Sequence, residues 1–185
     1  MHKEYNLITD FDFTLIADFF TGLDRQGPGN DDQTRRALGL LGELPPRPLI
    51  ADIGCGTGRQ TAALLRELPD ARATAVDLLP EMIGGLRRRM AAEALADRVT
   101  GIVASMESLP FADASFDLLW AEGSIYNVGF ERGLGAWRRF LKRGGYVAVT
   151  DCSWLGSARP GRMEFFRDNF PDIDDIAGKI DALQR

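Results

Sequence analysis

The chain has 185 residues, of which 45% are hydrophobic and 26% charged, a balance typical of a globular protein and not of a disordered or fibrous one. Its formal net charge is −5, which argues against a general binder of nucleic acid or of membrane surfaces. Two cysteines form no disulfide framework and fit a reducing compartment, so we expect a cytoplasmic protein. The only histidine is His2, so we expect no metal site and no histidine-centred catalysis.

The chain shows no internal repeat and no linker, and its length predicts a single domain over residues 1–185. The sequence shows no apolar signal-peptide core and no apolar run of about 18 residues, so neither a signal peptide nor a membrane span is expected. Composition and periodicity divide the domain into an N-terminal helical cap (1–45), a core (46–151) and a helical C-terminal tail (152–185).

The N-terminal cap has helical periodicity. Phe11, Leu15 and Phe19 recur every four residues and predict an amphipathic helix. After a turn rich in glycine, Asn30 with Gln33 three positions later predicts a capping box at the start of a second helix. We expect this helix to continue to the prolines at 45 and 46, with an apolar stripe of Ala37, Leu41 and Leu44.

From residue 48 onward, short apolar runs alternate with segments of helical spacing. The runs cover residues 48–53, 72–77, 99–104, 116–121 and 146–150, and each predicts a buried strand. Strands that alternate with helices form right-handed βαβ units. The sequence therefore predicts an α/β fold with a doubly wound, mostly parallel sheet, whose ligands bind at the carboxyl ends of the strands.

Two helices of the core carry more detailed expectations. The helix that begins near Phe130 is expected to run through Leu141, with Lys142 and Arg143 in its last turn and Gly144 as a left-handed cap. The helix that begins at Pro80 contains three consecutive arginines, residues 87–89, which we expect to form a solvated face.

The first strand is followed by the loop Gly54-Cys55-Gly56-Thr57-Gly58. Glycines let the backbone turn tightly and approach a ligand closely, and the helix that follows presents free N–H groups. The dinucleotide-binding fingerprint requires a glycine at position 59, where this chain has Arg59. The loop also contains no basic residue to bind a phosphate, which argues against a P-loop. Asp77 follows the second strand, where an acid can accept hydrogen bonds from both hydroxyls of a ribose.

Residues 49–58 (LIADIGCGTG) and 76–77 (VD) resemble the cofactor site of the class I (seven-strand, Rossmann-like) S-adenosylmethionine-dependent methyltransferases. Residues 104–111 and 140–147 are similar to later segments of the small-molecule (type 11-like) branch of that family. The resemblance implies the strand order 3-2-1-4-5, S-adenosyl-L-methionine as the cofactor and S-adenosyl-L-homocysteine as the product. It implies cofactor contacts for Asp52, Gly54, Cys55, Gly56, Gly58, Asp77, Leu78, Ser105 and Met106.

The resemblance implies that Asp77 holds the ribose and that Leu78 lies against the adenine, with Ser105 and Met106 on its other side. A role for Met106 in the core is the alternative. Asp52 would orient the loop or reach the methionine amino group. Residues 26–29 resemble the lid of small-molecule methyltransferases, and a simple surface turn is the alternative.

The position after the fourth strand faces the transferred methyl group in this family, and Glu122 and Tyr126 are the candidate catalytic residues. Glu122 could stabilise the sulfonium, contact the methionine amine or act as a base, and a purely structural role is the alternative. Tyr126 could offer a cation–π face.

The chain departs from the family after residue 150. We expect strands six and seven of the family to be missing, because the tail has helical spacing at Phe166 and Phe170 and again at Ile173, Ile176, Ile180 and Leu183. Strand five is then expected to be an unpaired edge, which predicts a homodimer. The functional hypothesis is methyl transfer to a small-molecule acceptor, with no nucleic acid and no membrane as a partner. The alternatives are a non-enzymatic S-adenosylmethionine-binding module and a nicotinamide-dependent oxidoreductase.

Overall fold

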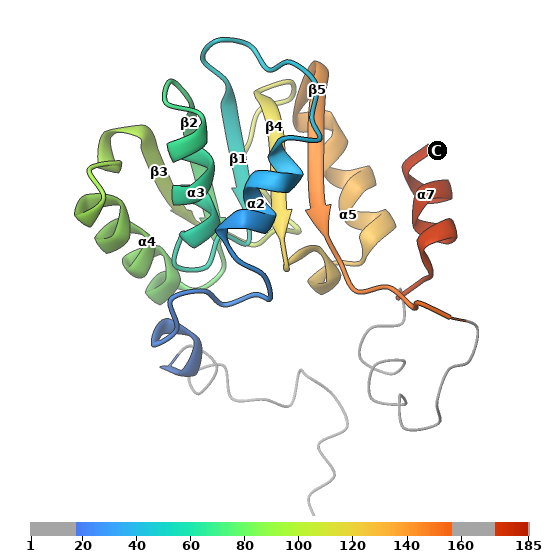
Figure 1. The fold of residues 1–185 in the computed structure, drawn as a ribbon, viewed down its shortest axis with the longest axis horizontal. Helices are drawn as coiled ribbons and strands as arrows, with labels where there is room; N and C mark the ends of the chain where they lie inside the picture. Colours follow the sequence, from blue (N-terminus) through green and yellow to red (C-terminus); the bar gives the residue numbers. More distant parts are fainter. Residues whose placement is uncertain (1–17, 157–172, 185) are drawn as a thin grey trace, which may run out of the picture.

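The computed structural model describes residues 18–156 and 173–184, and its centre is a five-stranded sheet with helices on both faces (Figure 1). Neighbouring strands pair in parallel, in the order β3-β2-β1-β4-β5. The predicted α/β fold and its strand order 3-2-1-4-5 are therefore confirmed. The strands are β1 (Leu49–Ile53), β2 (Arg72–Asp77), β3 (Val99–Val103), β4 (Phe116–Glu122) and β5 (Leu141–Thr150).

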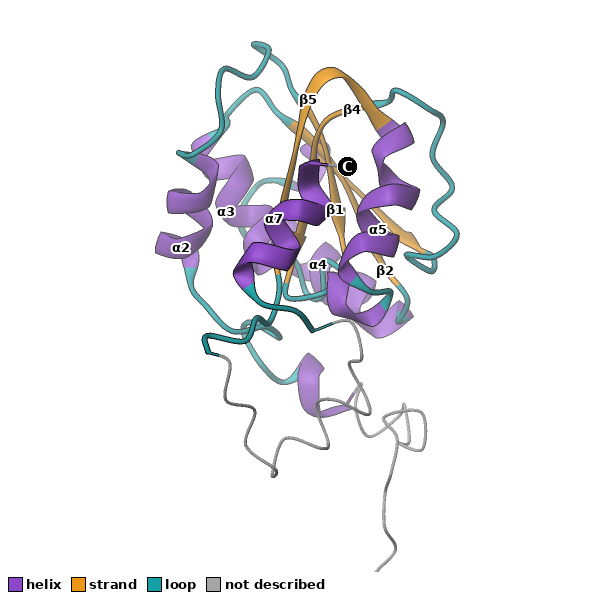
Figure 2. Ribbon diagram, turned by 90° about the vertical axis from the view of Figure 1, so that its right-hand side faces the viewer, coloured by secondary structure: helices purple, strands orange, loops and turns teal. Residues whose placement is uncertain are grey.

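Helices cover both faces of the sheet, as the edge-on view in Figure 2 shows for α2 and α3 on one side and α5 on the other. Short 3-10 turns at Ala96–Arg98, Ile125–Asn127 and Arg138–Phe140 join some of these elements. The helices are α2 (Asp31–Leu38), α3 (Arg59–Glu67), α4 (Pro80–Ala92), α5 (Phe130–Trp137) and α7 (Ile176–Gln184).

The alternation of side chains along the strands separates two hydrophobic cores. Ile50 of β1 and Leu118 of β4 are buried with α3 and α4, whereas Ile53 and Leu119 are buried with α5 on the opposite face. Complete burial of one such side chain contributes about 1.5–3 kcal/mol, so these two cores fix the positions of the strand ends. The site at the strand ends is therefore built on a rigid frame.

The start of α2 agrees with the sequence, but its end does not. Asn30 and Gln33 form the predicted capping box, each backbone N–H donating to the other residue's side-chain oxygen at 3.1 Å. The helix ends at Leu38 with Gly39 as its cap, so its expected continuation to Pro45 is wrong. Glycine is a poor helix former, which explains this end. The predicted apolar residues Ala37, Leu41 and Leu44 still pack against the core.

The boundary between α5 and β5 is also different from the expected one. The helix ends at Trp137, and Leu141 already pairs with Phe116 as the first residue of β5. Gly144 has the predicted left-handed backbone (φ 79°), but it lies inside β5, where the register with β4 shifts. Pairing with β4 satisfies the backbone of this segment better than another helical turn at the edge of the sheet.

The described part of the tail contains the predicted helix, α7, which lies beside α5 (Figures 1 and 2). The buried Lys179 attaches it to the end of β5 by donating to the Asp151 carboxylate and to the Cys152 carbonyl. Within the described residues β5 pairs with β4 alone, and none of the helices is long and apolar enough to cross a membrane. The predicted helical residues Phe11, Leu15, Phe166 and Phe170 lie outside the described residues.

Candidate functional site

A cavity of about 440 Å³ opens at the carboxyl ends of the strands, where the strand order reverses between β1 and β4. Its walls are the glycine loop, the ends of β2 and β4, residues 105–107, and an N-terminal segment that includes residues 25–28. Two of the predicted cofactor-binding residues, Asp52 and Gly58, do not line this cavity. The predicted site residues that line it are Gly54, Cys55, Gly56, Asp77, Leu78, Ser105, Met106, Glu122 and Tyr126.

Every backbone N–H of the glycine loop has a partner inside the protein. The N–H groups of Gly54 and Cys55 both donate to the Val76 carbonyl, at 2.8 and 2.9 Å, and that of Gly58 donates to the Cys55 carbonyl at 2.9 Å. Those of Gly56 and Thr57 donate to side-chain oxygens of Asp77 and Gln26, both at 2.9 Å. None of these amides is left for a phosphate, and a phosphate cradle depends on such amides.

Two of the loop glycines are required for different reasons. Both have left-handed backbones, with φ 53° at Gly56 and φ 80° at Gly58. A Cβ on Gly56 would lie 2.4 Å from the side-chain oxygen of Gln26, on the cavity wall. A Cβ on Gly58 would lie 2.2 Å from Leu86 of α4. Gly58 therefore allows α3 to pack on α4 and has no direct place at the cavity.

Asp77 lies at the end of β2 with its carboxylate on the cavity wall. The carboxylate accepts hydrogen bonds from the backbone N–H groups of Gly56 at 2.9 Å and Leu79 at 3.1 Å. Burial raises its pKa, although these bonds act in the opposite direction. A carboxylate has about four lone-pair positions, so Asp77 retains the capacity to accept further bonds from ligand hydroxyls.

Asp52 is completely buried in β1, behind the glycine loop. One carboxylate oxygen accepts a bond from the Thr61 hydroxyl of α3, and the other has no hydrogen-bond partner. Burial raises the pKa of Asp52 to about 7, the Thr61 bond lowers it and the nearby charge of Glu122 raises it. Of its two suggested roles, the contact with Thr61 favours orientation of the loop and of α3.

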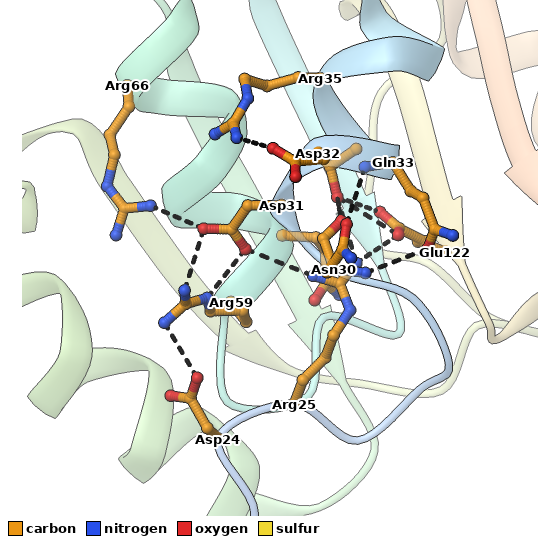
Figure 3. A network of polar contacts seen from close by, with 12 residues as sticks. Asp24, Arg25, Asn30, Asp31, Asp32, Gln33, Arg35, Arg59, Arg66 and Glu122 are labelled. Carbon is orange, nitrogen blue, oxygen red and sulfur yellow. Dashed lines mark hydrogen bonds and ion pairs between the residues drawn. The ribbon is translucent and has the colours of Figure 1, made fainter.

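Glu122 at the end of β4 lines the cavity, but its carboxylate already has several partners (Figure 3). It forms an ion pair with Arg25 and accepts hydrogen bonds from the Thr34 hydroxyl at 2.9 Å and the Trp120 indole N–H at 3.1 Å. Its side chain is only 6% exposed. This environment is typical of an anchoring carboxylate, whose oxygens hold Arg25, Thr34 and Trp120 in place.

Leu78 and Met106 provide apolar surface on the cavity wall, and Leu78 is 57% exposed. The Met106 carbonyl accepts the indole N–H of Trp137 at 2.9 Å, which fixes this stretch against α5. Tyr126, in the 3-10 turn after β4, lies at the cavity with 37% of its surface exposed, and burial of the rest raises the pKa of its hydroxyl.

The N-terminal segment contributes both residues that the sequence singled out and residues that it did not. Gln26 lies over the glycine loop, where its side-chain oxygen accepts from the Thr57 N–H at 2.9 Å and the Thr57 hydroxyl at 3.1 Å. The resemblance to a lid pointed to residues 26–29, and the structure places Gln26, Gly27 and Pro28 on the cavity wall. Arg25 and Thr34 were missed, because only the folded chain brings them to Glu122.

The described residues contain no cluster of His, Cys, Asp and Glu side chains that could hold a metal ion. Cys55 and Cys152 are both free thiols. Burial, together with the charges of Asp52 and Asp77, raises the pKa of the Cys55 thiol well above its ordinary value.

Comparisons with known proteins agree with this architecture. Residues 50–145 match the model of a family described as a methyltransferase domain. The chain is 35% identical over 159 residues to a malonyl-[acyl-carrier protein] O-methyltransferase of Dechloromonas aromatica, covering 82% of this chain and 55% of that one. It is 35% identical over 150 residues to a ubiquinone/menaquinone biosynthesis C-methyltransferase of Cereibacter sphaeroides, covering 79% and 59%.

A solved structure of an S-adenosylmethionine-dependent methyltransferase from Geobacter sulfurreducens, in complex with S-adenosyl-L-homocysteine, has the same fold, with a TM-score of 0.76 and 17% identity over 92% of this chain and 69% of that one. The chain spans little more than half the length of the two relatives above. The family model, however, matches more than half of this chain and includes β1 to β4 and the glycine loop. This protein belongs to the methyltransferase domain family.

Proposed function

We propose that this protein transfers a methyl group from S-adenosyl-L-methionine to a small-molecule acceptor and releases S-adenosyl-L-homocysteine. The observation that carries the proposal is the placement of Asp77 beside a glycine loop whose amides are all paired within the protein. Such a wall offers a carboxylate to ribose hydroxyls, and none of the loop amides remains unpaired for a pyrophosphate. Membership of the methyltransferase domain family supports the same assignment.

The walls of the cavity fit the parts of this cofactor. Asp77 would accept the ribose hydroxyls, and Leu78 and Met106 would pack against the adenine, with Ser105 at its border; all four line the cavity. The backbone of Gly54, Cys55 and Gly56 would lie against the methionine part. Asp52 orients this loop from behind through Thr61, and Gly58 keeps α3 close to α4.

S-Adenosylmethionine, when bound, supplies an electrophilic methyl group on a sulfonium. Because the transfer is an in-line displacement, the protein contributes mainly position and electrostatics. Glu122 places a negative charge near the cavity and anchors Arg25 and Thr34. Tyr126 offers an aromatic face at the position from which an acceptor approaches. We infer that both residues act by positioning and electrostatic stabilisation, and that Glu122 is not the base.

The acceptor is proposed to be a small molecule. Of the two relatives reported above, one is named for ubiquinone/menaquinone biosynthesis and the other for a malonyl group carried on acyl-carrier protein. The net charge of −5 disfavours nucleic acid. The two free cysteines support a reducing compartment, so we propose the cytoplasm.

We also propose a homodimer. The edge strand β5 and the exposed apolar residues Ile176, Ile180 and Leu183 of α7 offer a surface for a second copy. Light scattering checks this proposal: the wild-type protein gives the mass of a dimer, and Ile180→Asp gives that of a monomer. A monomeric wild type at high concentration contradicts it.

The cofactor is tested by thermal unfolding with S-adenosylhomocysteine or NAD at equal concentration. A ligand that binds only the folded state raises stability by RT ln(1 + [L]/Kd). We expect stabilisation by S-adenosylhomocysteine alone, and stabilisation by NAD alone supports the oxidoreductase alternative. Incubation with methyl-labelled S-adenosylmethionine and small-molecule extracts then separates an enzyme, which transfers the label, from a module that binds without turnover.

A further inference from the structure

Beside the cavity, six charged side chains form a closed ring in which acids and arginines alternate (Figure 3 shows part of it). Asp31 binds Arg59 at 2.9 Å and Arg66 at 3.2 Å, and Arg59 also binds Asp24 at 2.9 Å. Arg66 also pairs with Glu93. Arg89 of α4 closes the ring, because it pairs with both Glu93 and Asp24. The members in order are Asp24, Arg59, Asp31, Arg66, Glu93 and Arg89, with the last two bonds at 3.7 Å (Glu93–Arg89) and 2.7 Å (Arg89–Asp24).

The ring joins residues 24–31, which we call the strap, to two helices of the core. Asp24 and Asp31 stand at the two ends of the strap, Arg59 and Arg66 belong to α3, and Arg89 belongs to α4. The expectation that the three arginines at 87–89 form a solvated face is therefore wrong for Arg89, whose side chain is only 15% exposed.

The ring is connected to the cavity by two routes. Arg25 lies 3.7 Å from Asp31 and pairs on its other side with Glu122 on the cavity wall. Arg89 donates to the Thr57 carbonyl at 3.0 Å, while Gln26 accepts from the N–H and hydroxyl of the same residue. The glycine loop is thus held from both sides, by a ring member and by the strap.

The strap is attached to the core by polar contacts. The two hydrophobic cores contain no side chain of residues 24–31. Of the apolar side chains that precede it, Phe19 and Leu23 are exposed, at 66% and 40%, and Phe20 is half-buried at the cavity wall. Within residues 24–31 the attachment is therefore made mainly by the ion pairs and by the Gln26 amide.

The ring lies where dissolved ions can reach it. The side chains of Asp24, Arg66 and Arg59 are 67%, 41% and 31% exposed, whereas Asp31 is 16% exposed. Single exposed ion pairs contribute little, but a network that fixes a segment contributes more. Screening shortens the range of such attractions from about 10 Å at 0.1 M salt to about 3 Å at 1 M.

We propose that this ring is an ionic latch that holds the strap over the ligand cavity, so that the affinity of the cavity for its ligand falls as ionic strength rises. Asp24, Asp31, Arg59 and Arg89 are then positioning residues, which act through Arg25, Gln26 and Thr57. The ligand used as a probe rests on the proposed function, whereas the latch itself is visible without a ligand.

The test compares the wild-type protein with Asp24→Asn, which removes a charged partner of both Arg59 and Arg89. Asp24 belongs to no helix and to neither hydrophobic core. The control is Asp113→Asn, which removes another exposed ion pair, Asp113–Arg139, away from the strap. S-Adenosylhomocysteine, which carries no net charge, is titrated calorimetrically at about 0.05 and about 1 M NaCl. In parallel, hydrogen exchange of the amides of residues 24–31 is followed in the ligand-free proteins at both salt concentrations.

We expect the wild type and Asp113→Asn to lose about tenfold in affinity at high salt and to exchange the strap amides faster. At low salt, Asp24→Asn already binds S-adenosylhomocysteine as weakly, and exchanges the strap amides as fast, as the wild type does at high salt. A higher salt concentration then changes either quantity little in this variant. Salt-independent exchange of the strap in the wild type, or wild-type behaviour of Asp24→Asn, overturns the latch. If no protein binds S-adenosylhomocysteine, the proposed function fails, and the exchange data alone decide whether the latch exists.

Discussion

Arg25 and Glu122 form an ion pair that joins two positions 97 residues apart in the chain, one in the strap and one at the end of β4. Both side chains are nearly buried, at 11% and 6% exposure. Breaking a buried pair by removing one charge destabilises a protein strongly, because the other charge remains in a poorly solvated place. The pair therefore couples the wall of the cavity to the stability of the fold.

Glu122→Gln tests whether this residue anchors or reacts. We expect a loss of about 3 kcal/mol in the free energy of unfolding and weaker binding of S-adenosylhomocysteine, because Arg25 loses its main partner. Urea unfolding and calorimetric titration measure the two effects, with the exposed Glu43→Gln as the control. Normal stability and normal affinity with a loss of turnover alone would instead identify Glu122 as a base.

Asp77→Ala and Asp77→Asn separate binding from folding. The alanine variant removes the acceptor for Gly56 and Leu79 as well as for the ligand, so it loses both stability and affinity. A hydrogen bond to a charged group contributes about 1.5–3 kcal/mol, so we expect the affinity of Asp77→Ala for S-adenosylhomocysteine to fall at least about tenfold. The asparagine keeps one acceptor oxygen and loses less stability. Unchanged dissociation constants in both variants would exclude Asp77 from the ligand site.

The sequence predicted the frame of the site well, because local patterns encode it. The apolar run of β2 predicted the bounds Arg72–Asp77 that the structure shows, and the capping box of Asn30 marked the start of α2. A strand buried on both faces and a capped helix each leave a signal within a few residues. The end of β2 then placed Asp77 at the cavity without any knowledge of tertiary contacts.

The strap could not be predicted in the same way. Its contacts join Asp24 to Arg89 and Arg25 to Glu122, pairs whose members lie far apart in the chain. A charged residue has the same local appearance whether it is solvated or paired, so the arginine run gave no sign of the role of Arg89. Gly144 shows the converse case, since its left-handed backbone was predicted correctly and its element was not.

Gly58→Ala and Gly144→Ala form a matched pair for the glycine loop. Both positions have left-handed backbones, with φ 80° and 79°, but only at Gly58 would a Cβ meet another residue, Leu86 at 2.2 Å. We expect Gly144→Ala to lose about 1–2 kcal/mol from backbone strain and Gly58→Ala about 1–3 kcal/mol more from overpacking. Urea unfolding measures both, and equal losses would show that α3 and α4 do not need Gly58 for their contact.

Asp52→Asn tests the buried carboxyl behind the glycine loop. Because its pKa in the folded protein is about 7, against an ordinary value of 3.8, the folded state binds this proton more tightly than the unfolded chain does. The contribution to stability is therefore present in full below about pH 4 and is lost as the pH rises towards and past 7. A difference of this size between the folded and unfolded pKa of one carboxyl corresponds to several kcal/mol of stability. Asparagine does not ionise, so the stability of Asp52→Asn relative to the wild type should increase between pH 5 and pH 8. Urea midpoints at these two values measure the difference, and a constant difference would mean that Asp52 is already ionised in the folded protein at pH 5.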